Sequence, residues 1–264
     1  MSARPNPLPR LYRWRTDFVQ TPVLTLATAI CASASLLISL VDKSGRVQHR
    51  IARFWAGLCV RISGCRVVIR GKQNLHEHTV AVYASNHTSY MDTPVIFAAL
   101  PFQFRILARK PLWRIPFIGW YLDRSGQIPV DTTNPHTTLS SLGAGVKALR
   151  AGMPLFVFPE GGRTKDGELK KFMSGAAFLA IRAQVPLVPV ALSGVYDLLP
   201  IHTHHFYPGE LTVSVGEPIE TSGMTLRQAE QLTETLRAEI QELLRARMQG
   251  DRAVADQAGE LVQN

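Results

Sequence analysis

Residues 86–92 read Asn86-His87-Thr88-Ser89-Tyr90-Met91-Asp92 and join two apolar runs, residues 80–84 and residues 94–100. The first run is rich in β-branched residues and alanine, so residues 79–85 are predicted to form a buried strand. Asp92 or Thr93, followed by Pro94, is typical of a helix N-cap and first helical turn. The sequence therefore predicts that His87 lies in a loop between a strand and a helix.

His87 and Asp92 are a candidate base and its orienting carboxylate. In one continuous helix, about 100° per residue would turn these two side chains to roughly opposed faces. A loop removes that restriction, so the carboxylate can hold the imidazole tautomer while the histidine deprotonates a hydroxyl group. Taken alone, such a pair is more often structural than catalytic.

Composition bounds the domain count and the partners. The 264 residues, 46% of them hydrophobic, suit one domain of about 200 residues with appendages. Lys and Arg number 29 against 20 Asp and Glu, which favours anionic partners such as phospholipid headgroups. The basic residues form no single stripe and no nucleic-acid-binding module is recognised, so we expect no nucleic-acid partner. The three cysteines lack C-x-x-C spacing, which predicts neither a disulfide framework nor a zinc site.

The N-terminal 64 residues are predicted to contact a membrane. Residues 1–17 mix proline, arginine and aromatic residues, as suits a basic interfacial segment; a disordered tail is the alternative. Residues 18–41 carry no charge, and as a helix they would span about 36 Å, enough for a bilayer of about 30 Å. Residues 42–45 offer no clear cleavage site, so an uncleaved anchor is preferred to a signal peptide.

Basic residues flank residues 18–41 on both sides, which leaves two topologies open. Residues 18–64 form either one anchor helix or a two-helix hairpin whose second arm is residues 51–62. We therefore expect an integral or monotopic membrane protein, with the catalytic domain on the cytoplasmic face.

Short β-prone runs alternate with helical patterns through the rest of the chain. These runs are residues 65–70, 79–85, 104–108, 126–130, 155–158, 187–192 and 211–215. One helix is predicted from Asn134-Pro135 to Gly152, and another from the capping pair Thr225 and Gln228 to about Met248. This alternation favours an α/β fold with a mostly parallel central sheet flanked by helices, spanning residues 65–248, and a disordered tail at residues 249–264.

A second polar cluster follows the apolar run at residues 155–158. It reads Pro159-Glu160-Gly161-Gly162-Arg163-Thr164-Lys165. Its glycines free backbone N–H groups, Arg163 offers a bidentate fork for phosphate, and Lys165 adds a point charge. The spacing G-x-x-x-x-G-K-[ST] is absent, so this is not a nucleotide P-loop. Either an anion-binding loop or a tight surface turn fits the pattern.

Together these stretches resemble the glycerolipid acyltransferase family, which includes 1-acylglycerol-3-phosphate O-acyltransferases. Residues 86–92 match the family's N-H-x4-D motif, and residues 158–164 match its F-P-E-G-x-R-[ST] motif. Residues 185–190, Val-Pro-Leu-Val-Pro-Val, are similar to its fourth motif. The resemblance covers about residues 60–220, and the order of the motifs and the lengths between them are also similar to the family.

The resemblance implies transfer of a fatty acyl group from a thioester, on coenzyme A or acyl carrier protein, to the free hydroxyl of a lysolipid. Lysophosphatidic acid, giving phosphatidic acid, is the first candidate acceptor. His87 is then the general base and Asp92 its orienter, with no metal and no other cofactor. The implied acceptor-binding residues are Glu160, Gly161, Gly162, Arg163 and Thr164. Arg163 is the implied phosphate ligand, and Pro189 is expected to shape the acyl-donor side.

One position departs from the family pattern. The family's second motif ends in an arginine that binds the acceptor phosphate, whereas residues 126–132 of this chain end in Thr132. Arg124, Lys110 or Arg109 would replace that arginine, or the acceptor is another lysolipid such as a lyso-ornithine lipid. The aromatic stretch at residues 113–121 either lines an acyl tunnel, dips into lipid or packs in the core.

Two other classes of function remain open on the sequence. A metal-dependent hydrolase would use His87 and Asp92 together with His202, His204 and His205. A non-catalytic lipid-binding protein would keep the fold, and Thr132 in place of the arginine is the reason to consider it.

Overall fold

The computed structural model describes residues 10–75, 80–131, 135–200 and 203–263. Seven strands form one sheet in the order β1-β7-β6-β2-β5-β3-β4, and every neighbouring pair is parallel except β6 with β7. The strands are β1 Arg66–Arg70, β2 Val82–Ser85, β3 Arg105–Arg109, β4 Ile128–Val130, β5 Leu155–Val157, β6 Leu187–Ser193 and β7 Glu210–Val215. The predicted mostly parallel α/β sheet is confirmed, and each strand overlaps a predicted run.

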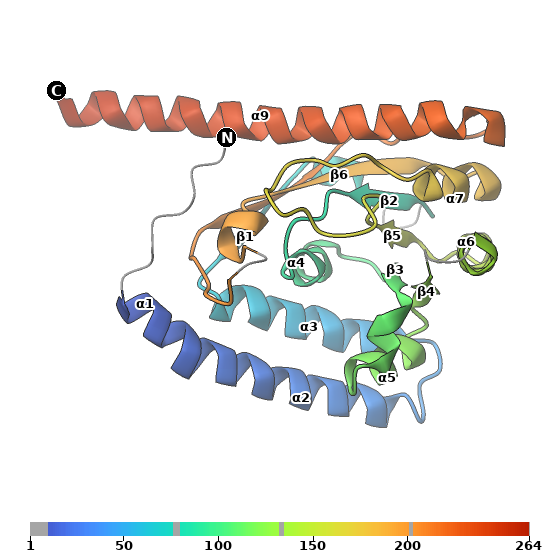
Figure 1. Ribbon diagram of the computed structural model, residues 1–264, viewed down its shortest axis with the longest axis horizontal. Coiled ribbons are helices and arrows are strands. Elements are labelled where there is room, and N and C mark those ends of the chain that lie inside the picture. Colours follow the sequence, from blue (N-terminus) through green and yellow to red (C-terminus); the bar gives the residue numbers. More distant parts are fainter. Residues whose placement is uncertain (1–9, 76–79, 132–134, 201–202, 264) are drawn as a thin grey trace.

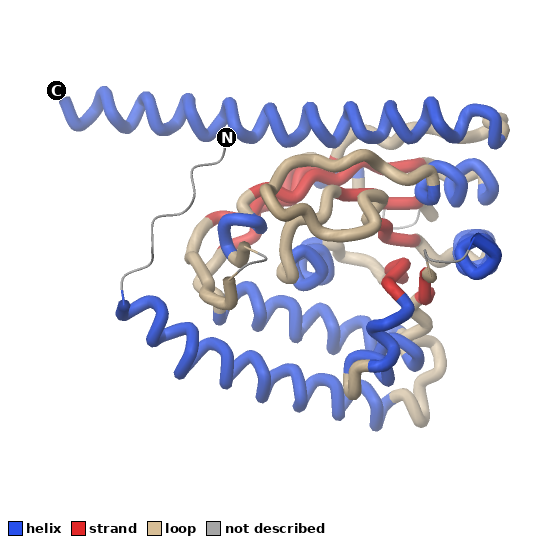
Figure 2. The backbone as a smooth tube through the Cα atoms, in the orientation of Figure 1, coloured by secondary structure: helices blue, strands red, loops and turns tan. Residues whose placement is uncertain are grey.

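Helices cover both faces of the sheet (Figure 2). On one face lie α6 (Pro135–Arg150), α7 (Gly175–Ala183) and α9 (Ala229–Gln263), and on the other lie α3 (Arg46–Ile62) and α4 (Asp92–Ala99). Strand β2 shows why both faces need cover, because Tyr83 packs in one hydrophobic cluster while Val82 and Ala84 pack in the other. Because its side chains alternate between two buried faces, this strand is apolar up to its last residue, Ser85.

Short elements complete the described chain. They are α1 Arg10–Arg15, η2 Lys72–Asn74, η3 Lys110–Arg114, α5 Ile118–Arg124, α8 Val195–Leu198 and η4 Leu226–Gln228. The predicted capping pair is confirmed, since the backbone N–H of Thr225 donates to Oε1 of Gln228 at 2.9 Å. Asn134, the predicted cap of α6, and Thr132 lie outside the described residues.

The C-terminal helix is longer than predicted. Helix α9 continues to Gln263, whereas the sequence predicts an end near Met248 and a disordered tail at residues 249–264. Residues 251–263 include three alanines and two glutamines, which favour helix, and the two glycines, Gly250 and Gly259, cost only about 1 kcal/mol each. The missing apolar periodicity predicts disorder, whereas the helix preference of the individual residues, which needs no apolar stripe, favours helix there instead.

The N-terminal segment folds as a helical hairpin. A π-helical turn, η1 (Thr16–Gln20), leads into α2 (Thr21–Ile38), and α2 packs against α3 (Figure 1). In the turn between them, the carboxylate of Asp42 accepts the backbone N–H groups of Ser44 at 2.8 Å and Val47 at 3.1 Å. Residues 1–9 of the predicted interfacial segment lie outside the described residues.

The two arms of the hairpin differ in burial. In α3, Ala52, Ala56 and Cys59 are buried against the domain, and the indole N–H of Trp55 donates to Oγ1 of Thr28 on α2. Residues Arg13–Ile38 form one continuous helical stretch that is long and apolar enough to cross a membrane, and only 11% of its most apolar part is buried. Most of the exposed apolar side chains of the hairpin therefore belong to the first arm, whereas the second arm exposes Phe54 and buries its alanines against the domain.

Candidate active site

His87 lies in the loop from β2 to α4, as the sequence predicts. Strand β2 ends at Ser85 and α4 begins at Asp92, and we call residues 86–92 the histidine loop. Strand β5 is the parallel neighbour of β2, with Ala84 opposite Val157. Since parallel strands end at the same edge of a sheet, the histidine loop meets the loop that follows β5, which we call the glycine loop (residues 159–167).

The imidazole of His87 is oriented by a buried carboxylate. Nδ1 of His87 lies 2.7 Å from Oδ2 of Asp92, and the Asp92 side chain is fully buried. An Nδ1–H that donates to Asp92 leaves the lone pair on Nε2, which is the tautomer that a general base needs. The geometry predicted for this pair is therefore present.

The backbone of the histidine loop donates hydrogen bonds to the carboxylate of Asp92. Its Oδ2 also accepts the backbone N–H groups of Thr88 at 2.6 Å and Ser89 at 2.8 Å. The ring N–H and the two backbone N–H groups therefore supply hydrogen-bond donors that offset the burial of this carboxylate.

Two contacts join the histidine loop to β6 and the segment after it. Asn86 is buried, and its side-chain amide pairs with both backbone groups of Leu192, donating at 3.0 Å and accepting at 2.8 Å. The hydroxyl of Ser89 donates to the carbonyl of Leu199 at 2.8 Å. Asn86 opens the motif but was not among the predicted site residues, because the sequence gives no sign of a partner 106 positions away.

The glycine loop fixes the backbone and the ring of His87. The backbone N–H of His87 donates to Oε1 of Glu160 at 2.9 Å, and the N–H of Thr164 donates to the His87 carbonyl at 3.0 Å. The ring of Phe158 stacks on the imidazole with centroids 4.0 Å apart and planes 19° apart. Phe158 and Glu160 before the glycines, and Thr164 after them, thus position His87.

Glu160 is an under-satisfied buried acid. Its side chain is 9% exposed, and Oε2 has no hydrogen-bond partner among the described residues. Burial raises the pKa of Glu160 to about 7, although the His87 N–H and Lys170 act in the opposite direction. The second oxygen is therefore a buried acceptor near the imidazole.

Arg163 is held beside the histidine loop. Its Nε donates to the carbonyl of Ser89 at 3.0 Å, and its guanidinium carbon lies 4.0 Å from the centre of the Tyr90 ring. Burial lowers the pKa of Arg163, Asp92 and Tyr90 raise it, and the charge of Arg109 lowers it further. The guanidinium group of Arg109 therefore lies near that of Arg163.

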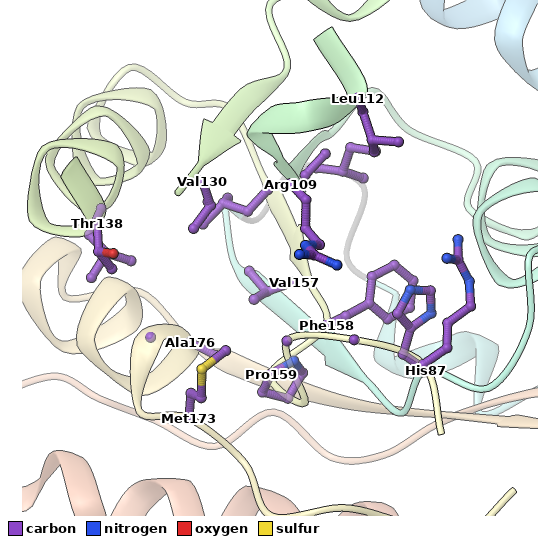
Figure 3. A pocket seen from close by; sticks show the side chains of 18 of the residues that line it. His87, Arg109, Leu112, Val130, Thr138, Val157, Phe158, Pro159, Met173 and Ala176 are labelled. Carbon is purple, nitrogen blue, oxygen red and sulfur yellow. The ribbon is translucent and has the colours of Figure 1, made fainter. Parts of the chain in front are cut away.

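A cavity of about 530 Å³ begins at these groups and runs between the sheet and helices α6 and α7. His87, Arg109, Arg163 and the two glycines line one end, and Leu142, Met173 and Phe178 line the interior. Figure 3 shows Arg109 and His87 pointing toward the same space above Phe158. Among the described residues that line this cavity none carries a carboxylate, so its two arginines face a space without a counter-charge.

Gly161 makes room at this end of the cavity. Its φ is +68°, and a Cβ added there would lie 2.5 Å from Cε of Met173. A side chain at this position would be strained and would push into Met173, so the sharp turn of the glycine loop depends on this residue.

Several predicted site residues lie outside the cavity lining. Glu160 and Thr164 contact the His87 backbone, and neither faces the cavity. Arg124 is exposed at the end of α5, and Lys110 points to Asp131 at 3.8 Å. Their neighbour Arg109, from the carboxyl end of β3, faces the cavity instead.

Pro189, which the resemblance implies shapes the acyl-donor side, is not among the residues that line this cavity. It is buried within β6, opposite Ala84 of β2, and it lies against Gly216, where an added Cβ would approach its ring to 2.8 Å. Strand β6 is separated by β2 from β5, and residues of β5 and β3 line the cavity. Pro189 therefore lies within the sheet and away from the cavity that Arg109 faces.

The histidines of the H-T-H-H segment gather elsewhere. Nε2 of His204 and of His205 lie 3.4 and 3.5 Å from Oδ1 of Asp17 on η1. Within the described residues, the groups close enough to share a metal ion are these three, and His87 and Asp92 are not among them. His202 lies outside the described residues. The arrangement required for the metal-dependent hydrolase is absent from the described part of the chain.

Known proteins match the same region. An acyltransferase family model matches residues 66–193. A chloroplastic 1-acyl-sn-glycerol-3-phosphate acyltransferase of Arabidopsis thaliana is 31% identical over 67% of this chain and 50% of its own length. A human 1-acyl-sn-glycerol-3-phosphate acyltransferase beta is 29% identical over 80% of this chain and 78% of its own length. The chain spans about half the length of the chloroplastic relatives of Arabidopsis thaliana and Brassica napus that it matches.

The fold also matches a solved structure. The crystal structure of the 1-acyl-sn-glycerophosphate acyltransferase PlsC from Thermotoga maritima superposes with a TM-score of 0.67 at 22% identity, covering 84% of this chain and 95% of the other. That likeness extends the shared fold beyond the region of the two motifs. By its family-model match, its relatives and the two motifs that meet at His87, the chain belongs to the acyltransferase family.

Proposed function

We propose that the protein transfers a fatty acyl group from a thioester to the free hydroxyl of a lysolipid, with lysophosphatidic acid as the acceptor and phosphatidic acid as the product. The observation that carries this proposal is the position of His87: oriented by Asp92, it lies where two arginines meet an apolar cavity. The names of the relatives support the same reaction.

The acceptor phosphate is assigned to Arg163 and Arg109. Both guanidinium groups line the same end of the cavity as His87, and Arg109 lies where it can do the work of the arginine that Thr132 replaces. Arginine suits phosphate because its planar fork can donate two parallel hydrogen bonds. An aminolipid acceptor, such as a lyso-ornithine lipid, would gain less from a pair of cations.

The apolar interior of the cavity is assigned to an acyl chain. Leu142, Met173 and Phe178 line it, and 530 Å³ lies within the range of about 300–1,000 Å³ for small-molecule pockets. This volume does not depend on the carrier, so either coenzyme A or acyl carrier protein can present the thioester.

Proton transfer in the reaction runs through His87. The acceptor oxygen bonds to the thioester carbonyl carbon as its proton passes to Nε2, and Asp92 stabilises the imidazolium that forms. When the carbon–sulfur bond breaks, the imidazolium returns the proton to the thiolate, and the free thiol leaves. Direct attack needs no acyl-enzyme, no metal and no cofactor.

The test is acyl transfer by purified protein in detergent, with thioester consumption and lipid product both measured. His87→Ala should lower kcat by about 10³-fold or more, since a general base that also returns the proton contributes about 10²–10⁴-fold. The exposed His204→Ala, near the same end of the sheet, is the matched control and should keep full activity. Substantial activity in His87→Ala would refute the proposed base.

The acceptor is tested by competition. Lysophosphatidic acid and a lyso-ornithine lipid of equal chain length compete in one reaction, and the ratio of products gives the ratio of their kcat/KM values. A ratio in favour of lysophosphatidic acid that collapses in Arg109→Gln supports the phosphate site. Lipid binding without thioester consumption, with every acceptor, would favour a non-catalytic protein.

A further inference from the structure

The segment between β3 and β4 exposes a group of large apolar side chains. They are Leu112 (37% exposed), Ile115 (43%), Phe117 (44%), Ile118 (41%) and Trp120 (52%). We call these five residues the apolar turn. Contiguous apolar side chains of this size on a protein surface mark a site of interaction with a protein, a ligand or a membrane.

The backbone of the apolar turn is strained and closely packed. Phe117 has φ +62° and ψ −50°, a conformation that is rare for any residue other than glycine. Gly119 packs so tightly that an added Cβ would lie 2.1 Å from the carbonyl oxygen of Trp113. The rings of Phe117 and Trp120 meet edge to face with centroids 5.3 Å apart. The fold thus holds these rings outward instead of burying them.

The apolar turn is continuous with the cavity. Pro111 and Leu112 line the cavity, and Leu112 is also a member of the exposed group. Figure 3 shows Leu112 on the cavity wall beyond Arg109. An apolar surface therefore extends from solvent, over Leu112, to the end of the cavity that holds His87.

The neighbours of the apolar turn point to a lipid surface as its partner. Helix α5 packs against α2, whose Val23, Leu26 and Ile30 are exposed, and both helices lie on the side of the sheet away from α9 (Figure 1). Lys110, Arg114 and Arg124 are exposed around the turn, and the acids near them are Asp123 and Asp131, the latter 3.8 Å from Lys110. Apolar side chains rimmed by basic ones match the acyl and headgroup layers of an anionic membrane.

We propose that the apolar turn inserts into the same leaflet as α2 and is the route by which a lysolipid passes between the bilayer and the cavity. The passage of a lysolipid rests on the proposed function, whereas the insertion of the apolar turn into the membrane does not. The acceptor phosphate would move from the basic rim to Arg109 and Arg163, while its acyl chain slides along Leu112.

The kinetic test compares two presentations of the acceptor. One is lysophosphatidic acid in vesicles of phosphatidylcholine and phosphatidylglycerol, and the other is a short-chain lysophosphatidic acid that is monomeric in solution. The variant Phe117→Gly/Trp120→Ser removes both rings, and glycine accepts the positive φ, so the turn keeps its backbone. Its kcat/KM should fall about tenfold on vesicles, because burial of two aromatic rings is lost, and should stay unchanged with the monomeric acceptor.

The matched control is Leu226→Ser, an exposed leucine on η4 next to α9, which should behave as the unmodified protein in both assays. An equal loss with both presentations, or no loss on vesicles, overturns the proposed route.

A second measurement stands apart from catalysis. Vesicles that contain brominated phospholipids quench the fluorescence of tryptophan inserted in the bilayer, and the difference between the unmodified protein and Trp120→Phe reports Trp120 alone. Quenching of that difference signal supports insertion, even if no acyl transfer is found with any acceptor. An unquenched signal from membrane-bound protein overturns the proposal, whatever the outcome for the proposed function.

Discussion

The histidine loop and the glycine loop lie at the same edge of the sheet, yet they differ in how fully their polar groups are paired. In the histidine loop, within the described residues, no buried side-chain nitrogen or oxygen lacks a partner. In the glycine loop, Oε2 of Glu160 is buried and has no hydrogen-bond partner among the described residues. Arg163 donates to the carbonyl of Ser89 and lies over the exposed ring of Tyr90.

This difference separates two tasks. A base must hold one orientation before the substrate arrives, so its loop is closed by internal hydrogen bonds. A group that binds an anion must exchange part of its environment for the ligand, so its loop keeps donors and acceptors uncommitted. Changes to the His87–Asp92 pair should therefore act on kcat, whereas changes to Glu160 or to the groups that hold Arg163 should act on stability or on KM.

The largest effect is expected for Asp92→Asn. A single oxygen, Oδ2, now accepts three N–H donors. An amide that turns its oxygen to these donors is neutral and cannot stabilise the imidazolium, and one that turns its NH2 group to them opposes all three and favours the other imidazole tautomer. Loss of the charge and of the correct imidazole tautomer should lower kcat by about 10³–10⁴-fold, with little change in KM. Steady-state kinetics on purified protein measure both constants.

The control for that variant is Asn86→Ala, which breaks the pair of hydrogen bonds to Leu192 while the His87–Asp92 contact stays. It should destabilise the fold by about 1–3 kcal/mol, the cost of leaving a buried group unpaired, and its folded fraction should retain far more activity than Asp92→Asn. Equal losses of kcat would mean that the two effects share a structural cause.

The next effect is a pH dependence of stability that comes from Glu160. The pKa of this acid is about 7 in the folded protein, against 4.5 for a solvent-exposed glutamate. Between these two values the folded state binds more protons than the unfolded state, so the unfolding free energy falls as pH rises and the loss is complete above pH 7. The difference corresponds to about 3 kcal/mol.

Glu160→Gln cannot titrate and still accepts the His87 N–H. Its Tm should therefore exceed that of the unmodified protein at pH 8, and the difference should shrink toward pH 5. The exposed Glu230→Gln on α9 is the control and should leave the profile unchanged. A Tm difference that is constant from pH 5 to pH 8 would show that Glu160 titrates normally in the folded state.

Much of the fold follows from local patterns. Seven apolar runs predicted seven strands, and the position of Pro94 predicted where α4 begins, because both depend on neighbours in the sequence. Two features depended on packing or on intrinsic preference instead. The sequence predicts the second arm as residues 51–62, whereas α3 begins at Arg46 and buries Ala52 and Ala56 against the domain. Helix α9 continues past Gly250 although the sequence there has no apolar periodicity.

The candidate site was predicted where motif residues meet other motif residues and missed where distant segments meet. His87 with Asp92 is a local pair, so its spacing could be interpreted. Arg109 was one of three candidates to replace the missing arginine, and of the three it is the one that lines the cavity, from the end of β3 beside β5. Tyr90 had no assigned role, since its partner Arg163 lies on the other loop.

The smallest effect is expected for Tyr90→Leu, which tests how Arg163 is held. Tyr90 is 58% exposed, and its ring faces the guanidinium at 4.0 Å. A cation–π contact at an exposed site is worth about 0.5–1 kcal/mol, so KM for lysophosphatidic acid should rise about two- to fivefold while kcat stays constant. Tyr90→Phe keeps the aromatic face and should restore the original KM. If Tyr90→Phe matches Tyr90→Leu, the hydroxyl and not the ring face matters, and Arg163 is then oriented by its bond to Ser89 alone.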